Sequence, residues 1–505
     1  MAQRFYKVRL RESAFPMLSE QQTRTHIATS AGKAAPALES PGIAYCHNVM
    51  PSAYGYDSVG FSSVVSAAAV PAGLAFSDVR VIHGDNRTRI YLAWDTNGNL
   101  YSLLPSSTAW LPLLDTSPVT AGAGFSSDSV TIGTVNGVSY ILYSTTAAFI
   151  YNETTNKLDQ VVLSGLDINT VLGVVASSGY LIAYTKTAVA WSSTLLPTDF
   201  VPSTVTGAGG GNVAGIAGSI LFATSNTLGI LIYTDANTIA GTFTGNVQFP
   251  FKFREVENSK GGVNLDRIAY EANSSKQFIF SKAGLQSIDS RRAEAILPEV
   301  TDFLAGRRFE DYNEVTKLYE VTDLAPTATM QKKIKYIASR YLVISYGLTS
   351  FTHALVFDNA LQKLGKLKIS HADCFEYIDS QSEIAKESLA FVANDGSVQV
   401  VDFSTAAASS GVIILGKLQF SANRFITLLG VELENIDTVS DTLSVDSQVS
   451  LDGKNFTLTS GTSSEEADNF REYKFRSTAK NHSIVLAGKF NLVTVQVRYT
   501  LAGRR

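Results

Sequence analysis

The sequence has few cysteines and few charged residues. Cys46 and Cys374 are the two cysteines among 505 residues, which argues against a disulfide scaffold or a cysteine-rich metal site. Both are expected to be buried free thiols, because an unpaired cysteine packs as a small apolar side chain. Charged residues make up 17% of the chain, and the formal net charge is -4. The overall charge therefore gives no reason to expect binding of a polyanion such as nucleic acid.

Dense basic runs and long apolar runs are also missing. The most basic segments, Gln331–Tyr336 and Gly306–Arg308, are interpreted as a solvated strand face and a turn. No window approaches the roughly 18 consecutive apolar residues of a membrane-spanning helix. The opening MAQRFYKVRLRES is charged from its fourth residue, unlike a secretory signal peptide. We expect the chain to stay in the cytoplasm in which it is made, or to leave by a route other than secretion.

The sequence is rich in strand signals. Segments of four to eight apolar or β-branched residues recur along the chain, bounded by Gly, Asn, Asp or Ser. They include residues 89–94, 139–144, 179–184, 219–224, 277–282, 341–346 and 389–394. Two-residue hairpin turns, which need positive φ, are predicted at Asn97-Gly98, Asn136-Gly137, Asp395-Gly396 and Asp452-Gly453.

Many of these segments repeat one pattern of strand, small polar turn and second strand. Six or seven such units lie between about residue 75 and residue 405, at an irregular spacing of roughly 40 to 60 residues. That spacing is typical of a propeller blade, and a ring of blades leaves only short, protected sheet edges. The sequence therefore predicts an all-β fold with a divergent β-propeller core at residues 75–415.

The two ends of the chain differ from this core. Residues 416–505 are predicted to form a C-terminal β-sandwich, because FNLVTVQVRYTL alternates apolar and polar positions. Residues 1–74 are assigned to an N-terminal arm or platform segment. Alternation of Tyr6, Val8 and Leu10 with basic residues predicts a strand that joins this chain, another domain or a neighbouring subunit. Helical signals are confined to Pro298–Gly306 and, more weakly, Asp379–Ala390.

The stretch AWSSTLLPTDFVPS, residues 190–203, combines hydroxyls, a carboxylate and aromatic rings, as an active site would. A nucleophilic Ser192 or Ser193 would need a positioned base, yet none of the six histidines falls in a recognisable pairing motif. We instead expect Trp191 to end a strand as a buried ring. Pro197 should then stop strand pairing, and Asp199 should cap backbone N–H groups. The stretch is predicted to be structural.

Two segments rich in small residues have no chemical signature. GAGGGN, residues 207–212, lacks the Lys and the Ser or Thr of a phosphate-binding loop, and is predicted to be a flexible loop between blades. TSAGKAAPALESPG, residues 29–42, is interpreted either as a linker or as an arm that orders only against a neighbouring subunit.

Residues 188–203 resemble a motif of tail hub or nozzle proteins in short-tailed, podovirus-like bacteriophages. That motif has tryptophan–serine followed by proline–threonine–aspartate–phenylalanine. Residues 218–263 are similar to a second phrase of that family, in which a strand with glycine ahead of isoleucine-tyrosine-threonine precedes glycine-asparagine and proline-phenylalanine-x-phenylalanine. The matching residues are Gly229, Ile232, Tyr233, Thr234, Gly245, Asn246, Pro250, Phe251 and Phe253. Residues 41–61 and the segment from Val449 to the end are similar to the family's opening phrase and terminal sandwich.

The resemblance implies a non-enzymatic structural protein of the virion, assembled in the host cytoplasm and resident in the phage tail. Its implied partners are five further copies in a homo-hexameric ring, the portal and adaptor proteins of the head-to-tail connector, and tail fibre or spike proteins. Viral DNA would pass through the lumen without sequence-specific binding. We expect a net acidic lumen, because basic walls would retard DNA. No catalytic residue, cofactor or metal is implied. The chain is short for the longer nozzles, so a long distal tip is not expected.

The rival interpretation is a receptor-binding or glycan-degrading propeller tailspike. SLDGKNF, residues 450–456, is similar to a sialidase aspartate box but is one residue short and occurs once, so a hairpin turn is favoured. A glycosidase needs two carboxylates flanking the scissile bond, and no pair among the 45 acidic residues is marked by the sequence. Glu465-Glu466 is interpreted as part of a mobile polar loop. A glycan- or protein-binding propeller without catalysis stays open, since sequence does not place the 21 tyrosines.

Overall fold

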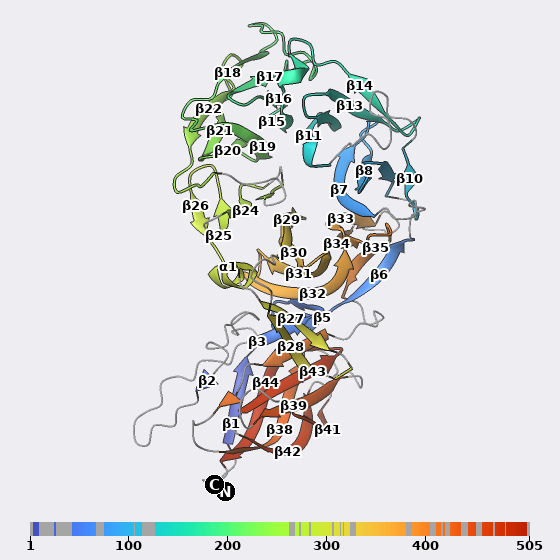
Figure 1. Ribbon diagram of the computed structural model, residues 1–505, viewed down its shortest axis with the longest axis vertical. Helices are drawn as coiled ribbons and strands as arrows, with labels where there is room; N and C mark the ends of the chain where they lie inside the picture. Colours follow the sequence, from blue (N-terminus) through green and yellow to red (C-terminus); the bar gives the residue numbers. More distant parts are fainter. Residues whose placement is uncertain are drawn as a thin grey trace.

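Two all-β bodies lie end to end in the computed structural model of the protein: a ring of blades and a smaller strand sandwich (Figure 1). The structure describes residues 4–9, 25–26, 43–66, 75–105, 107–113, 127–261, 268–271, 274–281, 284–305, 308–313, 315–316, 318–323, 330–379, 386–403, 411–415, 418–419, 425–435, 443–450, 457–467, 470–479 and 481–501.

In the part of the chain that the structure describes, the ring consists of seven four-stranded blades, each with antiparallel neighbours. Blades 1 to 3 are β7 (Phe76–His83), β8 (Arg89–Asp95), β9 (Leu100–Leu103) and β10 (Leu111–Pro112); β11 (Val130–Val135), β12 (Val138–Tyr143), β13 (Ala147–Asn152) and β14 (Lys157–Val161); and β15 (Gly173–Ser177), β16 (Tyr180–Tyr184), β17 (Ala188–Trp191) and β18 (Gly209–Asn212). Blades 4 and 5 are β19 (Ile220–Asn226), β20 (Gly229–Thr234), β21 (Thr238–Phe243) and β22 (Phe251–Glu255); and β23 (Ile268–Ala269), β24 (Gln277–Ser281), β25 (Gly284–Ile288) and β26 (Ala293–Ala295). Blades 6 and 7 are β29 (Gln331–Ile337), β30 (Tyr341–Gly347), β31 (Phe351–Asp358) and β32 (Lys363–His371); and β33 (Asp373–Asp379), β34 (Lys386–Val392), β35 (Val398–Asp402) and β6 (Gly60–Val65). The predicted all-β propeller is confirmed.

Turn chemistry sets the hairpins within the blades. Asn136 and Gly137 both have positive φ, 53° and 81°, between β11 and β12, which is the conformation of a type I′ hairpin turn. Gly98 and Gly396 also have positive φ, 83° each, as predicted for their turns. The predicted Asp452-Gly453 turn lies outside the described residues. Apolar clusters fill the space between each blade and the next around the ring, and they bury central strands such as β16 and β20 on both faces.

An N-terminal strand closes the ring. β6 pairs with β35 and supplies the outermost strand of blade 7, so that Gly60 lies opposite Asp402. The predicted domain boundaries at residues 74/75 and 415/416 therefore differ from the strand pairings. Residues 60–65 belong to the propeller, whereas β3 (Ile43–His47) and β36 (Gly411–Leu415) belong to the sandwich. Sequence order does not reveal such pairings, because each joins segments more than 300 residues apart.

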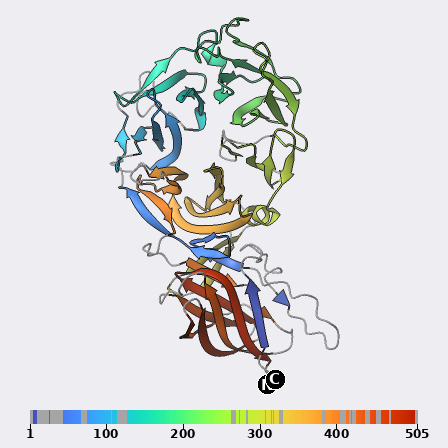
Figure 2. The same cartoon turned by 180° about the vertical axis from the view of Figure 1, so that it is seen from behind.

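The sandwich has two facing layers around one apolar core (Figures 1 and 2). Its first layer contains β1 (Arg4–Arg9), β44 (Asn491–Leu501), β38 (Ile426–Asn435), β42 (Phe470–Ala479) and β41 (Thr462–Ala467). Its second layer contains β2 (Thr25–His26), β37 (Leu418–Gln419), β43 (Asn481–Gly488), β36, β3, β39 (Ser444–Ser450) and β40 (Thr457–Ser460). β1 pairs antiparallel with β44, so the predicted first strand joins the last strand of its own chain.

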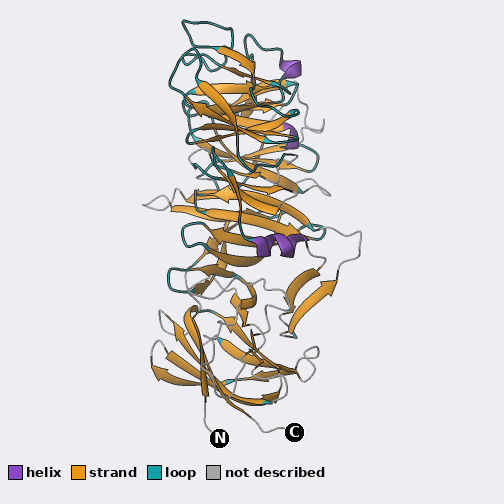
Figure 3. Cartoon of the chain, turned by 90° about the vertical axis from the view of Figure 1, so that its left-hand side faces the viewer, coloured by secondary structure: helices purple, strands orange, loops and turns teal. Residues whose placement is uncertain are grey.

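The propeller and the sandwich share one sheet. From the outer strand of blade 6 the order continues β32, β4 (Val49–Pro51), β5 (Tyr56–Ser58), β44, β38, β42 and β41, within an 11-stranded sheet. The hairpin of β27 (Arg308–Asn313) and β28 (Leu318–Asp323) lies beside this junction (Figure 1). Seen edge-on, the long axis runs from the blades through the shared strands to the sandwich (Figure 3). The link between the two bodies therefore includes continuous backbone pairing.

Helices are few and short among the described residues. The predicted helix is confirmed as α1 (Pro298–Ala305), which begins with proline at its first helical position. The weaker helical signal was wrong where it can be checked, since Lys386–Val392 form strand β34; the strand neighbours β33 and β35 override local periodicity. Glu465 and Glu466 lie in strand β41 rather than a loop. No helix among the described residues is long and apolar enough to cross a membrane.

Candidate functional site: the propeller channel and the outer rim

The stretch that combines hydroxyls, a carboxylate and aromatics is structural. Trp191 is buried, and its Nε1 donates to the Gly207 carbonyl at 3.0 Å. The Ser192 hydroxyl accepts from the Leu181 N–H at 3.0 Å and donates to the Ser193 carbonyl at 3.1 Å. Asp199 Oδ1 accepts from the backbone N–H of Val201 at 3.1 Å, as predicted for a cap. The Ser192 hydroxyl and the Asp199 carboxylate, which a nucleophilic site would use, therefore form hydrogen bonds with the backbone instead.

Ser193 also has a structural role, and most of the histidines are buried and neutral. The Ser193 hydroxyl accepts from the Leu195 N–H at 3.1 Å. Burial lowers the pKa of five of the six histidines from 6.5, His83 among them, and the four most buried are neutral at pH 7. The values are about 3 for His47 and about 4 for His353, His371 and His482. Among the described residues, no cluster of three or more His, Cys, Asp or Glu side chains is arranged to hold a metal ion. Both cysteines are buried free thiols, and burial raises each pKa to about 12.

An ionic cluster lies where the inner strands of blades 1, 6 and 7 meet. Lys333 Nζ lies 2.8 Å from Asp78 Oδ1 and 3.2 Å from Asp373 Oδ2, and Lys335 Nζ lies 2.5 Å from Asp373 Oδ2. Arg80 Nε lies 2.8 Å from Asp78 Oδ2. We call Asp78, Arg80, Lys333, Lys335 and Asp373 the channel cluster. It links three strands, β7, β29 and β33, that are up to 295 residues apart in sequence.

Backbone groups also bind the channel cluster. Asp373 Oδ2 accepts from the Val79 N–H at 2.7 Å, and Lys335 Nζ donates to the Val79 carbonyl at 2.8 Å. Arg80 donates to two carbonyls of blade 2 and its preceding turn. Burial would raise the pKa of Asp78, but Lys333, Arg80 and Lys335 outweigh burial and hold that pKa well below its usual value. Burial dominates at Asp373 and raises its pKa despite the two lysines.

This cluster corrects one interpretation of the sequence. Gln331–Tyr336 was assigned to a solvated strand face, yet the side chains of Lys333 and Lys335 are only 12% and 22% exposed. Their position follows from the alternation in β29, where Ile334 and Tyr336 face the apolar core instead. Lys333 and Lys335 on one face of the strand, opposite the apolar Ile334 and Tyr336, were a visible signal. Nothing in the sequence marked their partners Asp78 and Asp373, because these residues come close to the two lysines only when the ring is closed.

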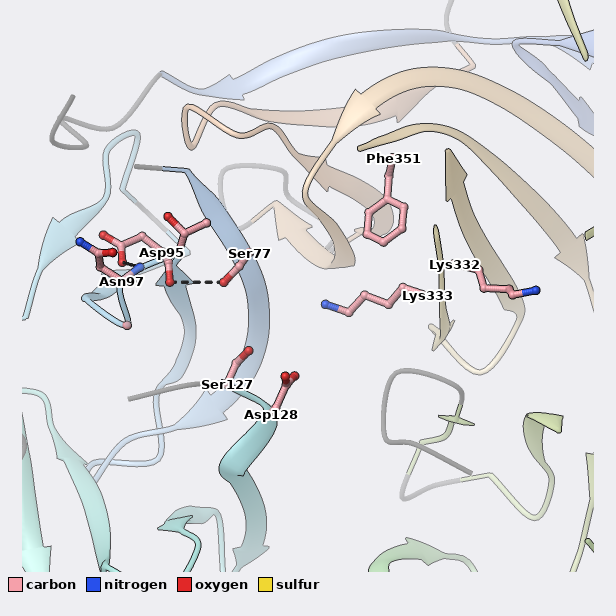
Figure 4. Close-up of a pocket in the computed structure, with 10 residues that line it drawn as sticks. Ser77, Asp95, Asn97, Ser127, Asp128, Lys332, Lys333 and Phe351 are labelled. Carbon is pink, nitrogen blue, oxygen red and sulfur yellow. Dashed lines mark hydrogen bonds between the residues drawn. The ribbon is translucent and has the colours of Figure 1, made fainter. Parts of the chain in front are cut away.

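A polar pocket of about 420 Å³ lies beside the channel cluster, between blade 1, blade 6 and the turn that leads into blade 2 (Figure 4). In this view Lys333 extends from β29 toward the blade 1 side, and Lys332 points the opposite way. Asp95 lines the pocket but accepts hydrogen bonds from the Asn97 and Asn99 N–H groups, the Asn99 side chain and the Tyr101 hydroxyl. Asp95 therefore holds the β8–β9 turn and does not stand ready as a catalytic carboxylate.

A second pocket of about 560 Å³ lies between the edges of blades 4 and 5. Charged side chains of both signs line it: Arg254, Glu255, Glu257, Asp289, Arg291 and Arg292. Arg254 donates to the Ser290 carbonyl at 2.8 Å, and Asp289 Oδ1 accepts from two backbone N–H groups. These contacts connect the two blades and leave the charges of the pocket balanced.

The outer rim of blades 3 and 4 carries exposed apolar side chains. They lie in two loops, 192–208 and 244–250, which we call the rim loops. Leu195, Val205 and Phe249 are 80%, 89% and 68% exposed. The loops are neighbours, because a Cβ built on Gly207 would lie 2.6 Å from Val247 Cγ1. Exposed apolar side chains on two neighbouring loops are available for contact with another protein.

The run at 207–212 ends in a strand instead of forming a flexible loop. Gly209–Asn212 form β18, the outer strand of blade 3, paired with β17. The glycines allow this close pairing, since a Cβ on Gly209 would lie 3.3 Å from the Trp191 ring. The other small-residue segment, 29–42, lies outside the described residues, as does most of the segment similar to an aspartate box.

A second cluster of polar side chains lies at the junction of propeller and sandwich. We call Tyr45, Asp311, His353, Lys366 and Lys368 the junction cluster. Asp311 of β27 accepts from Lys368 Nζ at 2.7 Å and from the Tyr45 hydroxyl at 3.3 Å, and its carboxylate lies 3.5 Å from His353 Nε2. Lys366 is buried, with Nζ 4.1 Å from the centroid of the Tyr45 ring. These contacts offset the burial of charge. They also join β3, β27, β31 and β32 into one unit.

The strand pairings define a seven-bladed β-propeller joined through blade 6 to a β-sandwich. No protein-family model matches the sequence, and no curated protein matches it. Among solved structures, the chain is similar to the WD40 β-propeller domain of Doa1, with 11% identity over 69% of this chain and 99% of that one, at a TM-score of 0.39. It is similar to YCF48 from Cyanidioschyzon merolae, with 12% identity over 68% and 99%, at a TM-score of 0.39. The extracellular domain of the putative hybrid two component system BT4673 from B. thetaiotaomicron shares 8% identity over 93% and 64%, at a TM-score of 0.40.

Proposed function

We propose that this chain is a structural subunit of the tail of a short-tailed bacteriophage, in the hub or nozzle ring that continues the DNA channel below the portal and adaptor. The resemblance in residues 188–203 and 218–263 supports this proposal. Both segments lie in blades 3 and 4 and include residues of the rim loops. The family resemblance therefore falls on a surface that is available for contact with other proteins.

The observation that carries the proposal is the shared sheet between propeller and sandwich. β32, β4, β5 and β44 form a continuous run of paired strands, and the junction cluster adds ionic and aromatic contacts beside it. A subunit that transmits force between two ends of a tail requires such a stiff connection. A flexible linker, in contrast, would let the two bodies move independently.

A structural role also fits the side-chain chemistry. The candidate nucleophiles Ser192 and Ser193 hold a turn, and Asp95 holds another. In the proposed hexamer, heterologous interfaces would close the ring, fibres or spikes would dock on its outside, and viral DNA would pass through a net acidic lumen without sequence-specific contacts. The chain would act without cofactor, metal or catalytic residue.

Cryo-electron microscopy of the particle that contains this chain tests the proposal, with classes viewed down the tail axis. The expected result is a six-fold ring of propellers around an axial bore. A peripheral three-fold appendage would contradict the hub and favour a receptor-binding or glycan-degrading tailspike, with glycan hydrolysis as the next assay. A ring whose bore is lined by Lys and Arg would keep the hub and overturn the acidic lumen.

A further inference from the structure

The outer edges of the seven blades are protected to different degrees. An unprotected edge strand presents unpaired N–H and C=O groups to other chains, and proteins usually cover or charge it. β32 of blade 6 is covered by β4. The others carry proline in β10, charged side chains in β14, β22 and β26, and a bulged pairing in β6. β18 of blade 3, Gly209–Asn212, has neither charge nor proline nor a pairing strand on its outer side among the described residues.

The backbone groups that β18 presents outward can be assigned. Val213 N–H donates to the Thr187 carbonyl at 3.1 Å, so this pair is hydrogen-bonded across β17 and β18. Antiparallel pairs alternate between hydrogen-bonded and non-hydrogen-bonded. Gly211 therefore bonds inward to Val189, while the N–H and C=O groups of Gly210 and Asn212 point away from β17. Both residues are exposed, and together they offer two donors and two acceptors to an additional strand.

The glycines also determine which strand can pair here. Cross-strand side-chain contacts stabilise a sheet, and two copies of β18 would place glycine opposite glycine with no such contacts. An incoming strand with large side chains would instead cover the glycines, as aromatic residues do for edge glycines elsewhere. A Cβ at Gly211 meets nothing within 4 Å, so space for such a side chain exists. A second copy of this chain is thus a poor occupant.

The side chains around β18 indicate which kind of molecule could pair with it. In the rim loops and β18, the single ionisable side chain is Asp199, whose carboxylate caps Val201. Nucleic acid and anionic membranes would need basic residues at this surface. The exposed Leu195, Val205 and Phe249 offer apolar contacts to an uncharged polypeptide segment.

We propose that β18 is a docking edge, to which an extended, uncharged segment of another protein, rich in aromatic and β-branched residues, adds as a fifth strand of blade 3. Main-chain hydrogen bonds to Gly210 and Asn212 hold that segment, and its alternate side chains cover the glycines and contact the rim loops. This inference goes beyond the proposed function and does not depend on it.

The test compares Gly211→Lys with Gln160→Lys in the full chain. Gly211→Lys places a charge on the open edge without a clash. Gln160→Lys places the same charge on the exposed outer strand of blade 2. The probe is a short capped peptide of alternating threonine and tyrosine, titrated by fluorescence anisotropy. Wild type and Gln160→Lys should bind equally, and Gly211→Lys should lose about tenfold or more in affinity. A capped polyproline peptide of the same length should not bind, because it has no backbone N–H donor on either edge.

Hydrogen exchange locates the binding. The amides of Gly210 and Asn212 should exchange quickly in the free protein and slow down when the peptide is bound, while those of blade 2 stay unchanged. Equal binding by Gly211→Lys, no binding at about 1 mM peptide, or protection elsewhere would each overturn the proposal. So would self-association of the wild type that Gly211→Lys abolishes, because the occupant would then be a second copy. Thermal melting of each variant confirms that it is folded.

Discussion

The half of the propeller next to the sandwich and the half farthest from it are built differently. Near the sandwich, blades 1, 6 and 7 meet at the ionic channel cluster, and the outer strand of blade 6 is covered by β4. On the far side, one apolar cluster fills the space between blades 3, 4 and 5, and the outer strand of blade 3 is uncovered. In the near half, the channel cluster and the outer strand of blade 6 make contacts within the chain. In the far half, the outer strand of blade 3 and the apolar rim loops are available for contact with other proteins.

The two halves of the propeller are held together by different kinds of contact. Ring closure joins strands from distant parts of the chain, and the ion pairs of the channel cluster lie between those strands. Blades 3, 4 and 5 are consecutive in sequence, and an apolar cluster packs them together. The predictions below test this contrast, beginning with the channel cluster.

Removing a carboxylate from the channel cluster should have the largest effect. Asp373→Ala removes a fully buried carboxylate and leaves the largely covered Lys333 and Lys335 with Asp78 as their remaining carboxylate, so we expect the unfolding free energy to fall by about 3–5 kcal/mol. Chemical denaturation measures the change. The matched control is Glu294→Ala, which removes an ion pair with Arg292 between two largely exposed side chains, and should cost less than about 1 kcal/mol. Similar losses in both variants would mean that the channel cluster is not a stability determinant.

Crowding the shared sheet should have the next largest effect. A Cβ at Gly365 would lie 2.4 Å from the Val49 carbonyl oxygen, where β32 meets β4. Gly365→Ala should therefore destabilise the chain by about 1–3 kcal/mol and increase hydrogen exchange in β4 and β5. Unchanged exchange in these strands would show that the junction tolerates the added methyl group and that the shared sheet is less tightly packed than described.

Acid should weaken the near half before the far half. Burial lowers the pKa of His353 to about 4 and of His47 to about 3, from 6.5. The unfolded chain therefore binds more protons between pH 6.5 and these values, and stability is lost as pH falls through that window, at up to about 1.4 kcal/mol per pH unit for each histidine. Asp311, whose pKa is lowered mainly by His353 and Lys368 against the effect of burial, adds a loss at lower pH.

Hydrogen exchange as a function of pH checks this order. Residues 84–352 contain no histidine, so blades 3 and 4 act as an internal control. Protection in β3 and β31 should decrease below pH 6.5 while protection in β19–β21 stays constant. His353→Gln should reduce the slope at the junction. Simultaneous loss of protection in both halves would contradict a locally acid-sensitive junction.

The smallest effect is expected at the open edge. Gly211→Ala adds a methyl group that meets nothing within 4 Å and limits the unfolded chain, so stability should change by no more than about 0.5–1 kcal/mol, toward greater stability. Thermal unfolding measures it. A clear destabilisation would show that the outer strand of blade 3 is under constraint and that the edge is less open than its neighbours indicate.

The sequence predicted local features better than distant ones. The hairpin at Asn136-Gly137, the helix at Pro298 and the structural role of Trp191 depend on residues close in sequence, and all three are found. The domain limits and the channel cluster depend on closure of the ring. Lys333 and Lys335 looked solvated because their acidic partners lie on other blades. The glycine run looked flexible because its pairing with β17, not its own propensity, makes it a strand.

The strand β6 has a consequence for the order in which the chain can be completed. Gly60 leaves the ribosome long before Asp402, its partner in blade 7, and β1 and β5 must wait for β44, whose last residue is Leu501. At about 5–20 residues per second, the first strands of both bodies wait tens of seconds for their partners. The ring cannot close before Asp402 has been synthesised, and the sandwich cannot close before Leu501 has been synthesised. A chain truncated before Asn491 would therefore lose the partner of its own first strands, and its early residues would be the ones most open to proteases and to pairing with other nascent chains.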